Sequence, residues 1–290
     1  MGASHEKKGI VCQDSSAHKV TEYYAAAVVA DGHGSKKHFR SNIGSQCAVE
    51  ATLETIERFY EDPEEFETNF PKNHKMIIKK IQKQIITLWN KKIMAHLEEH
   101  PVNAGERKKF TPDEFQAISP ESYYGTTLIA AVAARGFSFG LQIGDGSLVS
   151  VFEDGETIMP MDYEEANPAN ITSSMCNTNA AAMFESFYIE NKQVIAMFAS
   201  TDGLYTSFGS DNDFLDYHTI ISTQLPDMEK FEAAVVKNLV KRSHYGTEDD
   251  ISLAVAVNED LLNEKLDVIK QKVAENKQRA IERKASLLNK

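Results

Sequence analysis

The feature that most limits the fold of this chain is a set of short apolar segments, largely bounded by Gly, Asp or Asn. Short apolar segments between such residues are typical of β-strands. We predict strands at Tyr24–Ala30, Thr126–Ala134, Phe137–Ile143, Leu148–Phe152, Val194–Ala199 and Ile251–Val257. The dipeptides Arg135-Gly136 and Asp154-Gly155 predict tight hairpins.

Helical patterns lie between and after these strands. Apolar residues recur at helical spacing in Ser41–Tyr60, Lys72–His100 and Glu259–Lys290, where we predict helices. Pro101–Ser122 is rich in Pro and predicts a connecting loop, and Asp162–Glu190 lacks clear periodicity and predicts a flap. Because the strands cluster and the long helices come in pairs, we expect an α+β fold with segregated layers.

Composition excludes several classes of protein. The chain has 31 Lys+Arg and 43 Asp+Glu, a formal charge of −12, which argues against nucleic acid as the main partner because clustered Lys and Arg drive that binding. The longest apolar runs fall far short of the ~20 residues that span a bilayer, and no targeting segment is recognisable. Three widely spaced cysteines favour a reduced, cytoplasmic setting. We expect a monomer that does not bind membranes.

Two helical segments carry charge of their own. Residues 259–290 carry a formal charge of +2 and residues 1–258 carry −14, which predicts a domain over 1–258 followed by an amphipathic helical tail. Packing of this tail on the domain, or fraying into solvent, is favoured over binding of a partner. The lysine-rich face of Lys72–Lys92 is interpreted as a solvated surface in preference to a site for an acidic partner.

Four carboxylates lie at the ends of predicted strands or in the turns beside them: Asp31, Asp145, Asp202 and Asp249. Asp followed by Gly is a common turn, so each motif alone is weak evidence for a site. Several carboxylates that converge from different strands would repel one another unless cations lay between them. Hard divalent cations such as Mg²⁺ and Mn²⁺ prefer such oxygen ligands, so the four together indicate a metal site.

The order of the motifs is more specific than any one of them. In sequence they are Asp31-Gly32-His33-Gly34, Gly125-Thr126-Thr127, Gly144-Asp145-Gly146, Ser200-Thr201-Asp202-Gly203-Leu204 and Asp249-Asp250-Ile251-Ser252. Over about residues 4–257 this order resembles the metal-dependent serine/threonine protein phosphatases of the PPM (protein phosphatase 2C) family. The opening Ser4-His5, Gly9 and Cys12-Gln13-Asp14-Ser15 is similar to a bacterial branch of that family. The resemblance implies a four-layer αββα sandwich of two antiparallel β-sheets flanked by helix pairs.

The resemblance also implies a metal centre with two Mn²⁺ or Mg²⁺ ions. Asp31 would bridge the two ions and Gly32 would lend its carbonyl, with Asp202 and Asp249 completing the first site. Asp14 would assist the second ion through water. Here Gln13 replaces one member of the family's acidic pair.

A third, weaker metal is found in many members of the family. Asp145 and Asp202 would hold it here. The further acidic residue that often lies four positions after the second of these is Thr206 in this chain, so this sequence leaves the third metal open.

The implied chemistry is hydrolysis by a metal-bridging hydroxide, with no phosphoenzyme. His33 would be the general acid that protonates the leaving alkoxide, since imidazole titrates near neutral pH. Many members hold the substrate phosphate with an arginine, and this chain has Gly9 at that position. The nearest cations are Lys7, Lys8 and His5, which we predict to bind phosphate, although lysine cannot make the two-pronged contact of arginine.

The predicted function is dephosphorylation of phosphoserine and phosphothreonine in proteins. An alternative is a weak or inactive relative that binds phosphorylated or regulatory partners, which Gln13 and the missing arginine motivate. A small phosphate ester as the substrate is a third possibility. Because Asp31, Asp202 and Asp249 are all present, we favour the enzyme.

Overall fold

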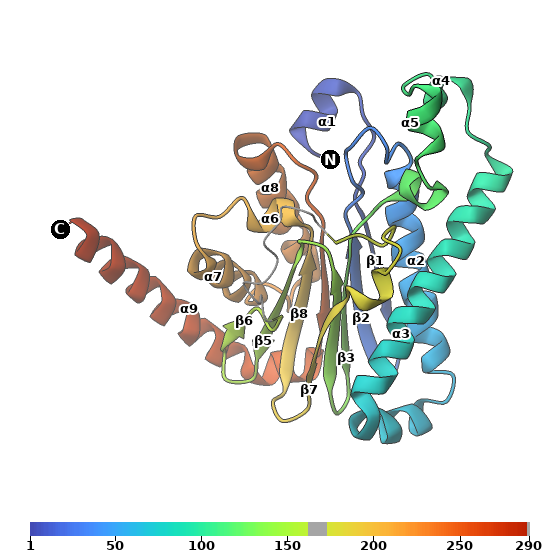
Figure 1. Cartoon of the computed structure of the whole chain (residues 1–290). Helices are drawn as coiled ribbons and strands as arrows, with labels where there is room; N and C mark the ends of the chain where they lie inside the picture. Colours follow the sequence, from blue (N-terminus) through green and yellow to red (C-terminus); the bar gives the residue numbers. More distant parts are fainter. Residues whose placement is uncertain (162–172, 289–290) are drawn as a thin grey trace.

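The computed structural model describes residues 1–161 and 173–288, and in that part of the chain two antiparallel sheets lie between layers of helices (Figure 1). The first sheet has, in spatial order, β1 (Ser15–Val20), β2 (Tyr24–Ala30), β3 (Leu128–Ala134), β4 (Ser138–Ile143) and β7 (Glu185–Ile189). The second has β6 (Thr157–Ile158), β5 (Ser147–Phe152), β8 (Val194–Ser200) and β9 (Leu253–Val257).

The central strands are buried on both faces. In β2, Ala26 and Val28 belong to the core beneath the helices, whereas Ala27 and Val29 belong to the core between the two sheets. Successive side chains of a strand point to opposite faces, so this division follows the period of two. Burial on both sides explains why such strands are continuous apolar runs in the sequence.

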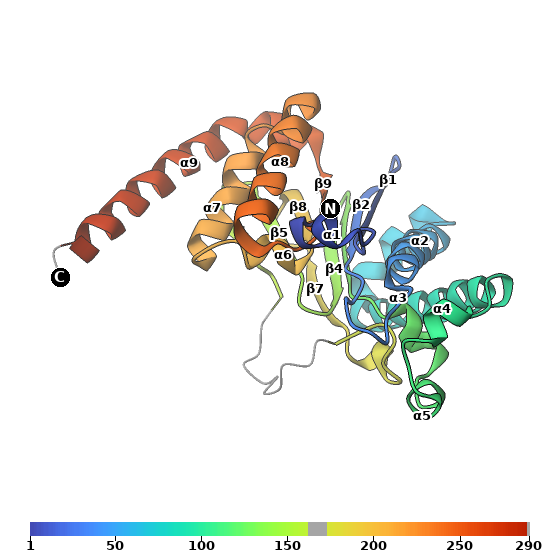
Figure 2. The ribbon, with the colours of Figure 1, turned by 90° about the horizontal axis from the view of Figure 1, so that it is seen from above.

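Helices cover the outer face of each sheet (Figure 2). The first sheet is covered by α2 (Ser41–Phe59) and α3 (Pro63–Glu99). The second is covered by α7 (Asp211–Ser222), α8 (Met228–Arg242) and the first part of α9 (Glu259–Leu288), with the short α6 (Asp202–Tyr205) directly after β8. These layers are the predicted α+β arrangement, a four-layer αββα sandwich, which is therefore confirmed.

The six predicted strands and both hairpins are confirmed, with strand ends that differ by at most two residues. The edge strands β1 and β6 were missed. Along β1 every second residue is exposed, so its sequence contains no apolar run. Edge strands form by pairing with a neighbour, in this case β2, and carry a weak local signal.

Three segments differ from prediction. The predicted loop Pro101–Ser122 contains α4 (Ala104–Arg107) and α5 (Pro112–Gln116), each begun by a capping box. Of the predicted flap Asp162–Glu190, residues 162–172 lie outside the described residues, and the remainder includes β7, which pairs with β4. Helix α3 begins at Pro63, where the Asp62 side chain accepts a hydrogen bond from the N–H of Glu65 and Pro occupies the first turn. Non-helical backbone dihedrals at Asn73 kink it, next to the predicted start at Lys72.

The first part of α9 packs on the domain, and the rest extends away from it (Figures 1 and 2). Leu261, Leu262 and Ile269 are buried in the core beneath this helix, whereas Ile281 is 62% exposed.

Although α3 and α9 are long, within the described ranges no helix combines the length and apolar character needed to cross a membrane. The domain boundary at residue 258 stays a prediction.

Candidate metal centre

Carboxylates from both sheets line one cavity of about 420 Å³. Asp31 directly follows β2, Asp145 lies between β4 and β5, Asp202 begins α6 after β8, and Asp249 precedes β9. Strands β2 and β4 are both antiparallel to β3, so they run in the same direction and their carboxyl ends lie at the same end of the first sheet. The end of β8 meets the start of β9 in the same way in the second sheet. The topology therefore brings the four predicted ligands to one end of the sandwich.

Two glycines allow the backbone to pack closely at this end. A Cβ on Gly32 would lie 2.6 Å from the Gln13 carbonyl oxygen, and Gly32 N–H donates to that oxygen over 3.2 Å. A Cβ on Gly125 would lie 2.3 Å from His38 Nδ1 and 3.0 Å from His33 Cδ2. A larger residue at either position would move the loop that carries Asp31 and His33.

The threonines after Gly125 fix the backbone of Asp31. Its N–H donates to Thr127 Oγ1 over 3.0 Å, and its carbonyl accepts from Thr126 Oγ1 and from the Thr127 N–H, both over 2.8 Å. Both threonines are buried. The Gly125-Thr126-Thr127 motif therefore positions the backbone of Asp31 at the cavity. This structural role could not be seen in the sequence.

Burial and mutual repulsion raise the pKa values of these carboxylates. Burial, followed by the charges of Asp14 and Asp202, raises the pKa of Asp31. Burial and the charge of Asp145 raise the pKa of Asp202. Partial burial raises the pKa of Asp249, although a hydrogen bond from the Asp250 N–H acts to lower it. A divalent cation would relieve this repulsion.

One oxygen at this site fits a metal ligand. Asp202 Oδ1 is buried and has no hydrogen-bond partner among the described residues. In the same residues, no three His, Cys, Asp or Glu side chains are already gathered closely enough to form a complete metal-binding group. The donor set thus suits hard cations, and the side chains would have to close in on them.

Asp14 lies behind the cavity lining. Its partly buried carboxylate accepts a hydrogen bond from Thr201 Oγ1 over 2.8 Å, and burial raises its pKa to about 7. Gln13, its neighbour, lines the cavity, and its Nε2 donates to Ser41 Oγ over 2.9 Å.

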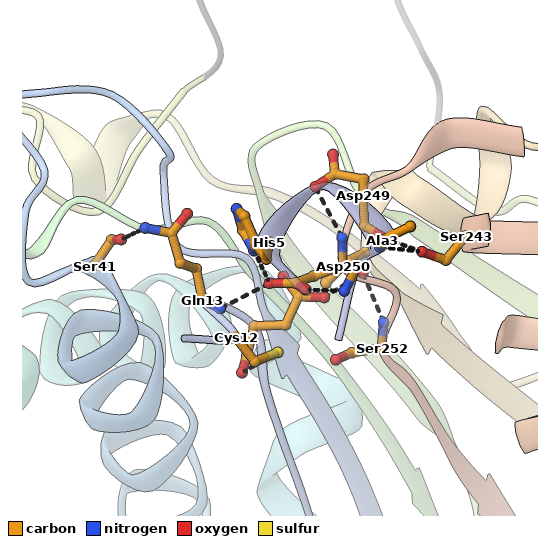
Figure 3. A network of polar contacts seen from close by, with 12 residues as sticks. Ala3, His5, Cys12, Gln13, Ser41, Ser243, Asp249, Asp250 and Ser252 are labelled. Carbon is orange, nitrogen blue, oxygen red and sulfur yellow. Dashed lines mark hydrogen bonds and ion pairs between the residues drawn. The ribbon is translucent and has the colours of Figure 1, made fainter. Parts of the chain in front are cut away.

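The three predicted phosphate-binding residues have different surroundings on the short helix α1 (Ala3–Lys8). His5 lines the cavity, and its Nδ1 lies 2.8 Å from Asp250 Oδ2 (Figure 3). Lys7 forms an exposed ion pair of 2.7 Å with Glu248, and Lys8 is exposed. Of the three, only His5 is among the described residues that line the cavity.

His33 lies in the lining beside a second histidine. The rings of His33 and His38 have centroids 4.9 Å apart. Burial, followed by the charge of His38, lowers the pKa of His33 to about 4, and burial also lowers the pKa of His38. His38 and Asp250 also line the cavity but were not predicted to belong to it. His38 lies outside the quoted motifs, and in the last motif the role of metal ligand was given to Asp249.

Comparison with known proteins settles the family. The family model for protein phosphatase 2C matches residues 1–241. The chain belongs to the protein phosphatase 2C family. It is accordingly a serine/threonine phosphatase of the protein phosphatase 2C type, as the order of its motifs predicted.

The solved structures that resemble this protein phosphatase 2C are distant from it in sequence. A bacterial serine phosphatase has 15% identity and a TM-score of 0.52, over 85% of this chain and 92% of that one. The phosphatase Stp1 from Staphylococcus aureus has 14% identity and a TM-score of 0.52, over 86% and 90%. The catalytic domain of PstP, solved with two manganese ions, has 15% identity and a TM-score of 0.46, over 86% and 91%. No curated protein matches the chain.

Proposed function

We propose that this phosphatase hydrolyses phosphoserine and phosphothreonine monoesters in proteins, at the carboxylate-lined cavity and with the help of two Mn²⁺ or Mg²⁺ ions. The observation that carries the proposal is the convergence of Asp31, Asp202 and Asp249 on one cavity, where a buried oxygen of Asp202 has no hydrogen-bond partner in the described part of the chain. Membership of the protein phosphatase 2C family supports the reaction class.

The two ions would be held by Asp31, the Gly32 carbonyl, Asp202 and Asp249, with Asp14 assisting through water. A third ion would be held by Asp145 together with Asp202. Ions bound there would lower the pKa of a water and neutralise charge on the phosphate oxygens. The contribution of the chain itself is to gather these oxygens from two sheets and to fix the Asp31 backbone between Thr126 and Thr127.

His33 would hold the proton that the leaving serine or threonine oxygen needs. It lines the cavity two residues after Asp31, and its backbone N–H donates to the Gly125 carbonyl over 3.0 Å, which fixes its place. Burial and the charge of His38 disfavour its protonated form in the surroundings described above. A phosphate dianion in the cavity would favour its protonated form.

His5, Lys7 and Lys8 are proposed to contribute positive charge toward the substrate phosphate, in place of the family's arginine. Lys7 and Lys8 would act as point charges from the surface. A cytoplasmic setting, a signalling role and a monomeric state remain part of the proposal.

The test measures Mn²⁺-dependent phosphate release from a phosphothreonine peptide and from p-nitrophenyl phosphate. Wild type is compared with Asp31→Asn and Asp202→Asn, and Asp260→Asn, an exposed residue of α9, is the matched control. We expect a loss of about 100-fold or more in the first two variants and none in the control, because metal ions supply several kcal/mol to the transition state. EDTA should abolish activity and Mn²⁺ restore it.

Other outcomes identify the alternatives. Activity that survives EDTA, or survives both substitutions, contradicts the metal-dependent mechanism. Wild type that binds Mn²⁺ in calorimetry but releases no phosphate supports a phosphoprotein-binding module. Activity that is confined to small esters points to a small-molecule substrate.

A further inference from the structure

Asp250 is a buried carboxylate at which three parts of the chain meet, and it has no role in the proposal above. Its side chain is 3% exposed. One oxygen accepts from the N–H of Gly2, and the other accepts from the Gln13 N–H and from His5 Nδ1, each over 2.8 Å (Figure 3). Asp250 is therefore an acceptor for three donors from the first 13 residues of the chain.

These bonds fix the start of α1 on the loop before β9. The N–H of Ala3 donates to Ser243 Oγ over 3.2 Å, and that of Ser4 donates to the Glu248 carbonyl over 2.9 Å. A Cβ on Gly2 would lie 2.4 Å from the backbone of Asp249, so the two segments are in direct contact. A helix of six residues is not stable by itself, so these contacts determine where α1 lies.

The same bonds set the orientation of His5. Because Nδ1 is committed to Asp250, Nε2 is the ring nitrogen left for a molecule in the cavity that both residues line. A ring protonated at both nitrogens would have one acceptor in Asp250 and a second in a phosphate oxygen. Lys7 has no comparable arrangement, since it is exposed and paired with Glu248.

We propose that Asp250 is a positioning residue that fixes the His5 ring, so that His5 Nε2 donates to a phosphate oxygen of the substrate. The proposal rests on the proposed function and names the group that takes over from the missing arginine. In this role Asp250 acts on the substrate through His5, and its bonds to Gly2 and Gln13 hold the chain around that residue.

The test is a double-mutant cycle on His5→Ala and Asp250→Asn, with His18→Ala and Asp260→Asn as controls on exposed residues. KM for the phosphothreonine peptide and inhibition by inorganic phosphate are measured. We expect each single variant to raise both constants about tenfold with kcat within about threefold, and the double variant to be no worse than His5→Ala. Multiplicative effects of the two substitutions would overturn the proposal.

A second measurement does not depend on activity. Nitrogen-15 NMR of the wild-type imidazoles is expected to show His5 with a proton held on Nδ1, and to show this preference lost in Asp250→Asn. A wild-type His5 ring that exchanges freely between tautomers would contradict the proposal even if Asp250→Asn does not fold. If the wild type releases no phosphate, the proposed function fails. Titration of inorganic phosphate into wild type and His5→Ala then still tests the role of His5. Equal affinities would overturn that role, and weaker binding by the variant would support it.

Discussion

The Thr201 hydroxyl donates to the carboxylate of Asp14 over 2.8 Å and joins residues that are 187 positions apart in the sequence. Asp14 precedes β1 of the first sheet and Thr201 follows β8 of the second, so this bond ties the two sheets together beneath the cavity. Thr201 Oγ1 also accepts from the Ser252 N–H over 2.9 Å. The Thr201 hydroxyl thus donates to a carboxylate and accepts from a backbone N–H below the cavity.

Thr201→Val is expected to lower the free energy of unfolding by ~1–3 kcal/mol, because it removes one hydrogen bond to the partly buried Asp14 carboxylate and the acceptor of the Ser252 N–H. Thr201→Ser keeps the hydroxyl and loses a methyl group, at a cost of about 1 kcal/mol. Urea denaturation of both variants checks the difference. Equal stabilities would show that the hydroxyl contributes nothing.

His33→Ala should affect two substrates unequally. With a phosphothreonine peptide, whose alkoxide leaving group needs a proton, kcat should fall by ~10²–10⁴. With p-nitrophenyl phosphate, whose leaving anion is stable without a proton, the loss should be far smaller. Steady-state kinetics at saturating Mn²⁺ measures both, and equal losses would contradict a proton-donating role.

Gly44→Ala is expected to destabilise the protein although alanine favours helices. A Cβ at Gly44 of α2 would lie 1.9 Å from the Tyr124 carbonyl oxygen and 2.7 Å from its carbon. Overpacking of this kind costs ~1–3 kcal/mol, more than the ~1 kcal/mol gained in helix propensity. Gly136→Ala is the control, since no described atom lies within 4 Å of its Cβ position. Thermal denaturation should show a lower Tm for Gly44→Ala alone.

His218 should make the fold sensitive to acid. Burial lowers its pKa to about 4, so the folded state keeps the ring neutral while the unfolded chain binds a proton below about pH 6.5. The stability from the neutral ring is complete above that pH and is lost as the pH falls from 6.5 toward 4, by up to ~3 kcal/mol.

His218→Phe removes this titration and keeps a ring against Phe198 and Phe214. Its free energy of unfolding should fall less between pH 6.5 and 4 than that of wild type. At pH 7.5 it should be no less stable, since His218 Nε2 is buried without a hydrogen-bond partner among the described residues. Parallel pH dependences would show that the ring is not buried in this way.

Two isoleucines on α9 distinguish its packed part from its projecting part. Ile269 is fully buried, so Ile269→Ala should cost ~2–5 kcal/mol. Ile281 is 62% exposed, and Ile281→Ala should change stability by less than ~0.5 kcal/mol. Denaturant unfolding measures both, and a large cost at Ile281 would mean that the outer part has a partner in solution.

The central strands and the ligand positions could be predicted because their signals are local. Strands β2 and β8 are buried on both faces, so their apolar runs are visible, and Asp31 and Asp202 stand directly after them. The edge strand β7 has no such run, because its first residues are exposed and pairing with β4 forms it.

The remaining cavity residues were hidden because their roles depend on distant contacts. Asp250 acquires its role from Gly2, Gln13 and His5, which lie more than 200 positions away in the sequence. The first part of α3 depends on the Asp62 cap at its start. A kink at Asn73, two residues after Pro71, separates it from the part that the apolar pattern predicts.

The bond from Gly2 to Asp250 spans 248 positions of sequence. During synthesis, a nascent chain can form the first sheet and its covering helices long before Asp249, Asp250 and β9 leave the ribosome. Until then the cavity lacks one wall and α1 lacks its anchor. Catalytic competence should therefore arise in a single late step of folding, and chains interrupted before residue 249 would carry most of the fold but none of the activity.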